Sequence, residues 1–110
     1  MNSTYTVRWS TVAENDLKKI IAYIAEDSPQ NALNVFKNIR HKASQLLTFP
    51  EKSRVVPELH DHGIMIYREL VIPPWRLIYK ITEKKVFVLS VIDSRQNVED
   101  ILLKRLIGPQ

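Results

Sequence analysis

Hydrophobic residues between Ile64 and Asp93 fall into three runs that are rich in β-branched and aromatic side chains. Pro73-Pro74 separates the first run from the second, because proline lacks an amide hydrogen and cannot continue a central strand. The polar segment Thr82-Glu83-Lys84-Lys85 separates the second run from the third. The pattern predicts three successive strands in an antiparallel meander, around which the rest of the chain is organised.

Two amphipathic helices are predicted before the meander, since apolar residues recur at helical spacing in both segments. Thr11-Val12-Ala13-Glu14 matches a capping box and predicts that the first helix starts at the threonine. Ser28 and Pro29 suit the N-cap and first position of the second helix, and Phe49-Pro50 ends it. The two apolar stripes are Ala13, Leu17, Ile20, Ile21 and Ile24, then Ala32, Val35, Phe36, Ile39, Ala43, Leu46 and Leu47. The short connection predicts an antiparallel helical hairpin that buries both stripes against one face of the sheet.

Shorter elements complete the predicted fold. Residues 5–9 alternate apolar and polar side chains, as in a short edge strand. Residues 51–63 form a polar connecting loop, anchored by Val55, Val56 and Leu59. Asn97 is a suitable cap for a last helix, which Gly108-Pro109 ends. The predicted fold class is α+β, with an N-terminal strand and antiparallel helical hairpin packed on a small antiparallel β-meander, and a short C-terminal helix.

The amino-acid composition is consistent with this predicted fold and limits the kinds of protein to which the chain could belong. At 110 residues we expect a single domain spanning residues 1–110, and 45% hydrophobic with 25% charged residues is ordinary for a globular protein. The chain has no cysteine, which excludes disulfides, thiol catalysis and thiolate metal sites. No segment approaches the apolar length of a membrane span, so we expect a soluble cytoplasmic protein that does not engage a membrane.

The net charge of +4 permits an acidic or nucleic-acid partner. Arg76 and Lys80 share one side of a predicted strand, Arg68 lies on its neighbour, and Arg95 follows the third strand. These four residues are candidates for a functional basic patch on one sheet face, because arginine binds phosphate or carboxylate in a bidentate manner. The alternative is a solvated face on which the cations pair with nearby carboxylates, namely Glu58, Glu69, Glu83 and Asp93.

Histidines and aromatic residues offer weaker candidates. His60 and His62 flank Asp61, but no third ligand lies at metal-binding spacing, so we predict a solvated loop and no metal or cofactor. Trp75 and Tyr79 share a strand face with apolar neighbours. We therefore expect core or interface aromatics rather than platforms for stacking bases.

Four segments carry recognisable motifs. The most specific is Trp75-Arg76-Leu77-Ile78-Tyr79-Lys80, an aromatic-Arg-aliphatic-Ile-Tyr motif. The others are Arg54-Val55-Val56-Pro57-Glu58-Leu59, Tyr67-Arg68-Glu69-Leu70 and Ser90-Val91-Ile92-Asp93-Ser94-Arg95. Together these segments resemble the RelE/ParE superfamily of toxins from bacterial type II toxin-antitoxin modules. The resemblance covers nearly the whole chain, and it implies a helical hairpin on a small antiparallel sheet. The length of the hairpin is similar to that of the ParE branch.

The resemblance implies one of two activities. RelE-like members are ribosome-dependent endoribonucleases, which carry an arginine where this chain has Val71-Ile72, and a tyrosine or histidine-tyrosine pair near the C-terminus. Here the helix between Asn97 and Leu106 has neither His nor Tyr. Where many members read His-Gly-Arg-Arg after the last strand, only Arg95 matches. Cleavage by 2′-hydroxyl attack needs a proton acceptor and a leaving-group donor, so the ParE-like branch is favoured and no catalytic residue is assigned.

A ParE-like member would inhibit DNA gyrase, arrest growth and be neutralised by a cognate ParD-like antitoxin in a toxin-antitoxin hetero-oligomer. Two alternatives remain: a RelE-like nuclease acting on mRNA at the ribosome, with Arg68, Arg76 and Arg95 steadying the phosphates, or an inactive homologue that only binds an antitoxin. The partners expected from the resemblance are therefore an antitoxin with DNA gyrase or, in the first alternative, the ribosome.

Overall fold

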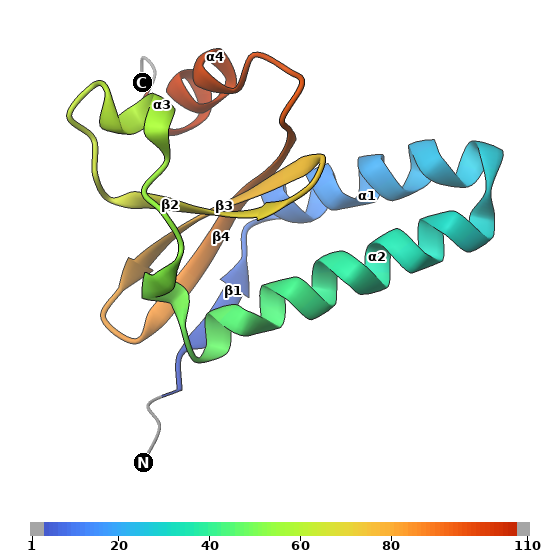
Figure 1. The fold of residues 1–110 in the computed structure, drawn as a ribbon, viewed down its shortest axis with the longest axis horizontal. Coiled ribbons are helices and arrows are strands. Elements are labelled where there is room, and N and C mark those ends of the chain that lie inside the picture. The colour runs from blue at the N-terminus through green and yellow to red at the C-terminus, as the bar shows by residue number, and fades with distance from the viewer. Residues whose placement is uncertain (1–3, 108–110) are drawn as a thin grey trace.

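The computed structural model describes residues 4–107, and the chain alternates between helical and extended segments (Figure 1). An N-terminal strand precedes two long helices, short helical turns connect these to three strands, and two helical segments follow. The strands are β1 (Thr6–Trp9), β2 (Tyr67–Ile72), β3 (Trp75–Thr82) and β4 (Lys85–Asp93). The helices are α1 (Thr11–Asp27), α2 (Pro29–Ala43), η1 (Ser44–Leu47), η2 (Pro50–Lys52), α3 (Pro57–His60), α4 (Val98–Leu102) and η3 (Leu103–Ile107).

The strands form a four-stranded mixed sheet in the order β1-β4-β3-β2. β2, β3 and β4 make the predicted antiparallel meander, although β2 begins at Tyr67 rather than at Ile64. β1 is an edge strand, as predicted, and it pairs parallel to β4 with Thr6 opposite Lys85. A parallel pair needs a long crossover, and here α1, α2 and two strands lie between its members.

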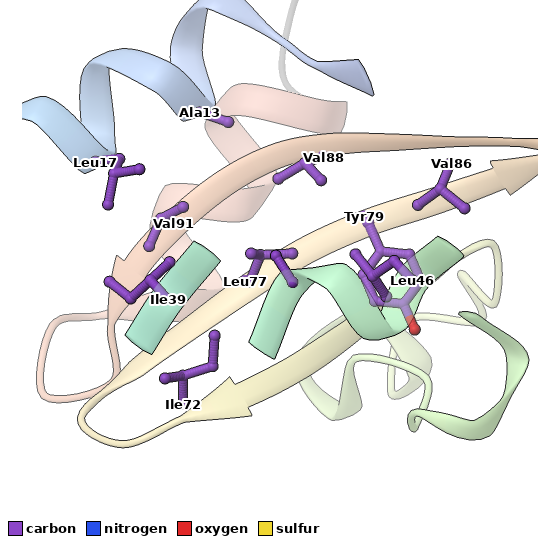
Figure 2. Close-up of a cluster of buried hydrophobic side chains, with 11 residues drawn as sticks. Ala13, Leu17, Ile39, Leu46, Ile72, Leu77, Tyr79, Val86, Val88 and Val91 are labelled. Atoms are coloured by element: carbon purple, nitrogen blue, oxygen red, sulfur yellow. The ribbon is translucent and has the colours of Figure 1, made fainter. Parts of the chain in front are cut away.

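The larger core lies between the helical hairpin and one face of the sheet (Figure 2). Side chains on β3 and β4 alternate between the two faces, so Leu77 and Tyr79 point to the hairpin while Ile78 points away. The buried members of this core are Ala13, Leu17, Ile39, Ala43, Leu46, Ile72, Leu77, Tyr79, Val86, Val88 and Val91.

The second core covers the opposite face and is smaller. It joins α3 and α4 to the sheet through Val56, Leu59, Tyr67, Ile78, Ile92, Val98 and Leu102. The predicted loop anchors Val56 and Leu59 are fully buried there, and Val55 forms an isolated bridge with Arg68. The sheet is therefore covered on both sides.

The hairpin extends beyond the strands, toward the right of Figure 1. Within α1 only Ala13 and Leu17 are buried, while Ile20, Ile21 and Ile24 are half-buried and Tyr23 is 76% exposed. Ile20 and Ile21 still pack against the larger core, but Ile24 belongs to neither core, so the prediction that the hairpin buries both apolar stripes against the sheet fails toward the outer end of α1. The outer turns of α1, which extend beyond the strands, are therefore accessible to a partner.

The predicted helix termini are confirmed at several places and corrected at others. Ser28 caps α2 by accepting a bond from the Asn31 amide, with Pro29 at the first helical position, and Asn97 caps α4. α1 starts at Thr11, as predicted, but its cap is Ser10, whose Oγ accepts from the Ala13 amide at 3.0 Å, so the predicted capping box at Thr11 is wrong. α2 ends at Ala43 and tightens into η1 before Phe49-Pro50. Gly108-Pro109 lies outside the described residues.

None of the helices between residues 4 and 107 has the length and apolar character that crossing a lipid bilayer requires.

Candidate functional site

The register of β2 and β3 divides the predicted basic patch between the two faces of the sheet. Arg68 lies opposite Tyr79 and Arg76 opposite Val71, and consecutive residues of a strand point to opposite sides. Arg76 and Lys80 therefore share the face that carries α3 and α4, whereas Arg68 lies on the hairpin face. Arg95 lies in the turn after β4. The four cations do not form one patch.

Arg76 belongs to a buried ion-pair cluster formed with Arg54, Glu58 and Glu69. Its Nη1 and Nη2 donate to the two carboxylate oxygens of Glu58 at 2.7 and 2.6 Å, and its Nε donates to Glu69 Oε1 at 2.6 Å. Arg54 pairs with the other oxygen of Glu69. Arg76 and Glu69 are 6% and 1% exposed, so this guanidinium is enclosed by its partners.

The hydrogen bonds of the ion-pair cluster shift the pKa values of Glu58 and Arg76. Hydrogen bonds from Arg76 lower the pKa of the Glu58 carboxyl, and hydrogen bonds to Glu58 and Glu69 raise the pKa of Arg76 further above its ordinary value. A bidentate arginine–carboxylate pair is the geometry in which such a bond is strongest. The cluster fastens α3 to the sheet.

The other predicted cations have separate environments. Arg68 Nη1 donates to the carbonyl oxygens of Ser53 at 2.6 Å and Glu51 at 3.3 Å, which ties the loop before β2 to the sheet. Lys80 is half-buried beside Tyr67. Arg95 binds Asp93, with Nε 2.9 Å from Oδ1, and its side chain is 77% exposed. These hydrogen bonds lower the pKa of Asp93 to about 2.

The remaining candidates from the sequence lie apart. His60, Asp61 and His62 lie at the end of α3 and in the following turn, and His62 Nε2 is 2.6 Å from Glu99 Oε2. Across residues 4–107, no group of three metal-ligating side chains gathers that could hold an ion. Tyr79 is a core residue, whose hydroxyl donates to the Pro50 carbonyl. Trp75 is half-buried and faces a groove.

This first groove, of about 460 Å³, lies between α1, the end of β4 and the C-terminal helical segment. It exists because β1 stops opposite Val88, whereas β4 continues to Asp93. The edge of β4 that faces α1 therefore has no strand partner over its last residues in the described chain. The groove is lined by Asp16, Lys19, Ile20, Tyr23, Ile24, Trp75, Val91, Ile92, Asp93, Arg95, Gln96, Ile101 and Arg105.

Asp16 closes the floor of the first groove. Its Oδ2 accepts from the Val91 amide at 3.0 Å, which satisfies a donor that β1 is too short to reach. The same carboxylate receives Arg105 Nη1 at 2.8 Å, and Arg105 Nη1 also lies 3.1 Å from Ser90 Oγ. Asp16 thus joins α1, β4 and η3 at one point. Its side chain is only 11% exposed.

A second groove runs along the other side of α1, between α1 and α2. Its volume is also about 460 Å³, but its floor is apolar and consists of Leu17, Ile21, Ala22 and Phe36. Arg40 closes one end, with its guanidinium carbon 4.8 Å from the Trp9 ring centre and 5.3 Å from the Phe36 ring centre. Residues 16, 19, 20, 23 and 24 line the first groove and 14, 17, 18, 21 and 22 line the second, so one helix separates two surfaces of different chemistry.

Sequence reasoning singled out two residues that line the first groove, Trp75 and Arg95, but did not bring them together. Asp16 and Lys19 lie outside the apolar stripe predicted for the first helix, and nothing in the spacing connects them to Arg105. The useful signal was the difference in length between the first and last strands, which leaves an unpaired edge that a polar side chain must satisfy.

Comparison with known proteins defines the class. The model of a family described as "ParE toxin of type II toxin-antitoxin system, parDE" matches residues 7–98. The chain therefore belongs to the ParE toxin family, which confirms the resemblance to the RelE/ParE superfamily and the preference for its ParE branch.

A solved structure shares the fold. The protein titled "Chromosomal ParDE TA system from P. aeruginosa" superposes with a TM-score of 0.68 at 18% sequence identity, over 83% of this chain and 97% of that chain. The predicted α+β fold is confirmed by this match. Among curated proteins, none matches this chain.

Proposed function

We propose that this ParE-family toxin arrests growth by inhibiting DNA gyrase in the cytoplasm, and that a cognate ParD-like antitoxin neutralises it. The observation that carries the proposal is the family match over residues 7–98. The toxin acts by binding and has no catalytic residue of its own.

The distribution of titratable side chains supports binding over RNA cleavage. Val71 and Ile72 occupy the end of β2 where a nuclease of the superfamily carries an arginine, and α4 and η3 contain neither His nor Tyr. Arg76 is held by Glu58 and Glu69 rather than facing solvent. Attack by a 2′-hydroxyl would require a proton acceptor, a proton donor and free cations near one phosphate, and this arrangement does not supply them.

The second groove is the surface that we assign to the antitoxin. Its apolar floor suits the apolar face of an amphipathic helix, which docks through residues spaced by three or four positions. An antitoxin segment that is disordered alone and folds on binding can cover such a groove while wrapping around the hairpin. In the resulting toxin-antitoxin hetero-oligomer, the bound antitoxin covers the toxin and prevents it from acting.

Two parallel assays test the proposed function. Purified toxin is added to a supercoiling reaction with bacterial DNA gyrase, and to translating ribosomes that carry an mRNA. Loss of supercoiling with intact mRNA is the expected result. Ribosome-dependent cleavage of the mRNA with undisturbed supercoiling would replace the proposal with the RelE-like nuclease, and absence of both effects would favour the inactive homologue.

A further inference from the structure

We infer that the first groove is the surface with which the toxin holds its target, and that its occupant is an extended, acidic segment of the target protein. The inference rests on the proposed function in one respect, namely that the toxin acts by binding another protein. It adds which surface does so and what chemistry that surface recognises.

The shape of the groove favours an extended chain. β1 pairs with β4 only as far as Val88, so the outer edge of β4 has no strand neighbour from Leu89 to Asp93, although Ser10 Oγ donates to the Leu89 carbonyl. Unpaired main-chain groups on a strand edge are the template onto which another extended segment adds. Asp16 already satisfies the Val91 amide. On the groove side, Ile92 and Asp93 have no strand neighbour within residues 4–107, while β3 pairs with their other edge.

The charges of the groove favour carboxylates on that segment. The two acidic side chains of the groove are largely buried, since Asp16 is 11% and Asp93 25% exposed. Each carboxylate accepts hydrogen bonds from a main-chain amide and from an arginine side chain. The cations project outward, since the Arg95 side chain is 77% exposed and Lys19 lies on the exposed side of α1. A partner entering from solvent therefore meets ammonium and guanidinium groups first.

The aromatic residues favour a protein partner with an apolar anchor. Trp75 is half-buried in the groove wall, and Tyr23, 76% exposed, stands at its outer end. Trp, Tyr and Arg are the side chains that most often dominate binding energy at protein interfaces.

The contrast with the second groove separates target from antitoxin. A long-lived complex favours an apolar surface, which the second groove provides, whereas a surface that must stay hydrated while free and then capture a partner rapidly favours charge. Because the two grooves lie on opposite sides of α1, their occupants contact the same helix through different residues.

Charge reversal at Lys19 tests the inference. Lys19→Glu is compared with Lys37→Glu, which makes the same change of charge at an exposed position of α2 that lines neither groove. Lys19→Arg restores the charge, and Arg95→Ala removes the second exposed cation. Each variant is induced in cells to measure growth arrest and is titrated into the gyrase supercoiling assay, with folding checked by circular dichroism.

We expect Lys19→Glu to need about tenfold more toxin for the same arrest, because a like charge then faces the acidic segment. Arg95→Ala should give a smaller loss in the same direction, while Lys37→Glu and Lys19→Arg should match the wild type. The inhibition by wild-type toxin should also weaken with added salt, more steeply than that by Lys19→Glu.

Several results would overturn the inference. A folded Lys19→Glu variant that arrests growth like the wild type excludes the groove as the target surface. Arrest that persists but is no longer relieved by co-expressed antitoxin would assign the groove to the antitoxin. Binding of a fluorescent DNA duplex by the wild type, lost in Lys19→Glu, would make it a nucleic-acid site.

The same experiment separates the two proposals. If the wild type arrests growth without inhibiting gyrase, the proposed target is wrong, and the groove is still judged by the growth of Lys19→Glu cells. If gyrase is inhibited equally by wild type and Lys19→Glu, only the groove assignment fails. A wild type that neither arrests growth nor inhibits gyrase overturns both.

Discussion

The ion-pair cluster beneath α3 and the first groove both place arginines against carboxylates, yet the two regions differ in burial. Arg76 is 6% exposed and binds two carboxylates, whereas the Arg95 side chain is 77% exposed and binds only the neighbouring Asp93. Both arginines were candidates for the same basic patch from their positions in the sequence. The difference teaches that burial and existing ion pairs decide whether a charged side chain is available to a partner. The residue type alone does not.

Desolvation explains the difference in physical terms. Taking Arg76 and Glu69 out of water is costly, and only the full set of hydrogen bonds within the ion-pair cluster offsets that cost. A partner could reach Arg76 only by breaking those bonds. Arg95 remains hydrated and exchanges water for a partner's carboxylate at little cost.

Arg76→Ala should have the largest effect on stability. The substitution leaves the Glu69 carboxylate buried with Arg54 as its remaining partner, and breaking a buried pair costs roughly 3–5 kcal/mol. Urea denaturation followed by circular dichroism measures the change in the free energy of unfolding. Loss of toxicity in this variant would then report a smaller folded population rather than a lost contact with the target.

A double variant provides the control. Arg76→Met with Glu69→Leu removes both buried charges, and we expect it to be more stable than Arg76→Ala alone, since isosteric apolar pairs often replace buried ion pairs without loss. Equal stability of Arg76→Ala and the wild type would show that the cluster does not hold α3 to the sheet, and the comparison with Arg95 would fail.

Asp16→Ala should have an intermediate effect. It leaves the Val91 amide without an acceptor and removes the partner of Arg105, and hydrogen bonds to charged groups contribute roughly 1.5–3 kcal/mol each when they are shielded from water. Asp16→Asn keeps an oxygen for the Val91 amide and should lose about half as much. The unfolding free energies of the two variants, measured side by side, distinguish the amide bond from the ion pair.

Arg95→Ala should have the smallest effect on stability, within about 0.5 kcal/mol, because exposed ion pairs contribute little. The effect of this substitution on the pKa of Asp93 should be easier to measure than its effect on stability. Arg95 lowers the pKa of Asp93 to about 2, so the pair stabilises the fold above the ordinary value of 3.8 and loses this contribution as the pH falls toward 2. Carboxyl carbon NMR of the variant should show the Asp93 pKa returning toward 3.8. An unchanged pKa would mean that Arg95 does not hold Asp93 in solution.

Local patterns were enough to predict the meander and the helical hairpin. The strand breaks at Pro73-Pro74 and the cap at Ser28 follow from the chemistry of single residues, and the structure has both. The start of α1 at Thr11 was predicted correctly, but its cap was placed on Thr11 instead of Ser10, because both residues are good caps and only the backbone decides between them. The parallel pairing of β1 could not be predicted, since periodicity carries no information on strand order.

The face of the sheet on which a side chain lies was predictable only where the length of a turn fixes the register of two paired strands. A two-residue turn after Ile72 pairs Ile72 with Trp75, which in turn places Arg68 opposite Tyr79 and on the other face from Arg76. That information was in the sequence and was not used. The first groove was not predictable in this way, because Asp16, Val91 and Arg105 meet only after helices and strands have packed.

The pairing of β1 with β4 also fixes the order in which the molecule can assemble. Thr6 and Lys85 come from opposite ends of the sequence, so the contact order of this strand pair is high and closing it carries a large loss of chain entropy. The hairpin and the meander involve nearer neighbours and can form earlier. We therefore expect the floor of the first groove, which needs α1 and the end of β4 together, to be among the last parts of the toxin to mature.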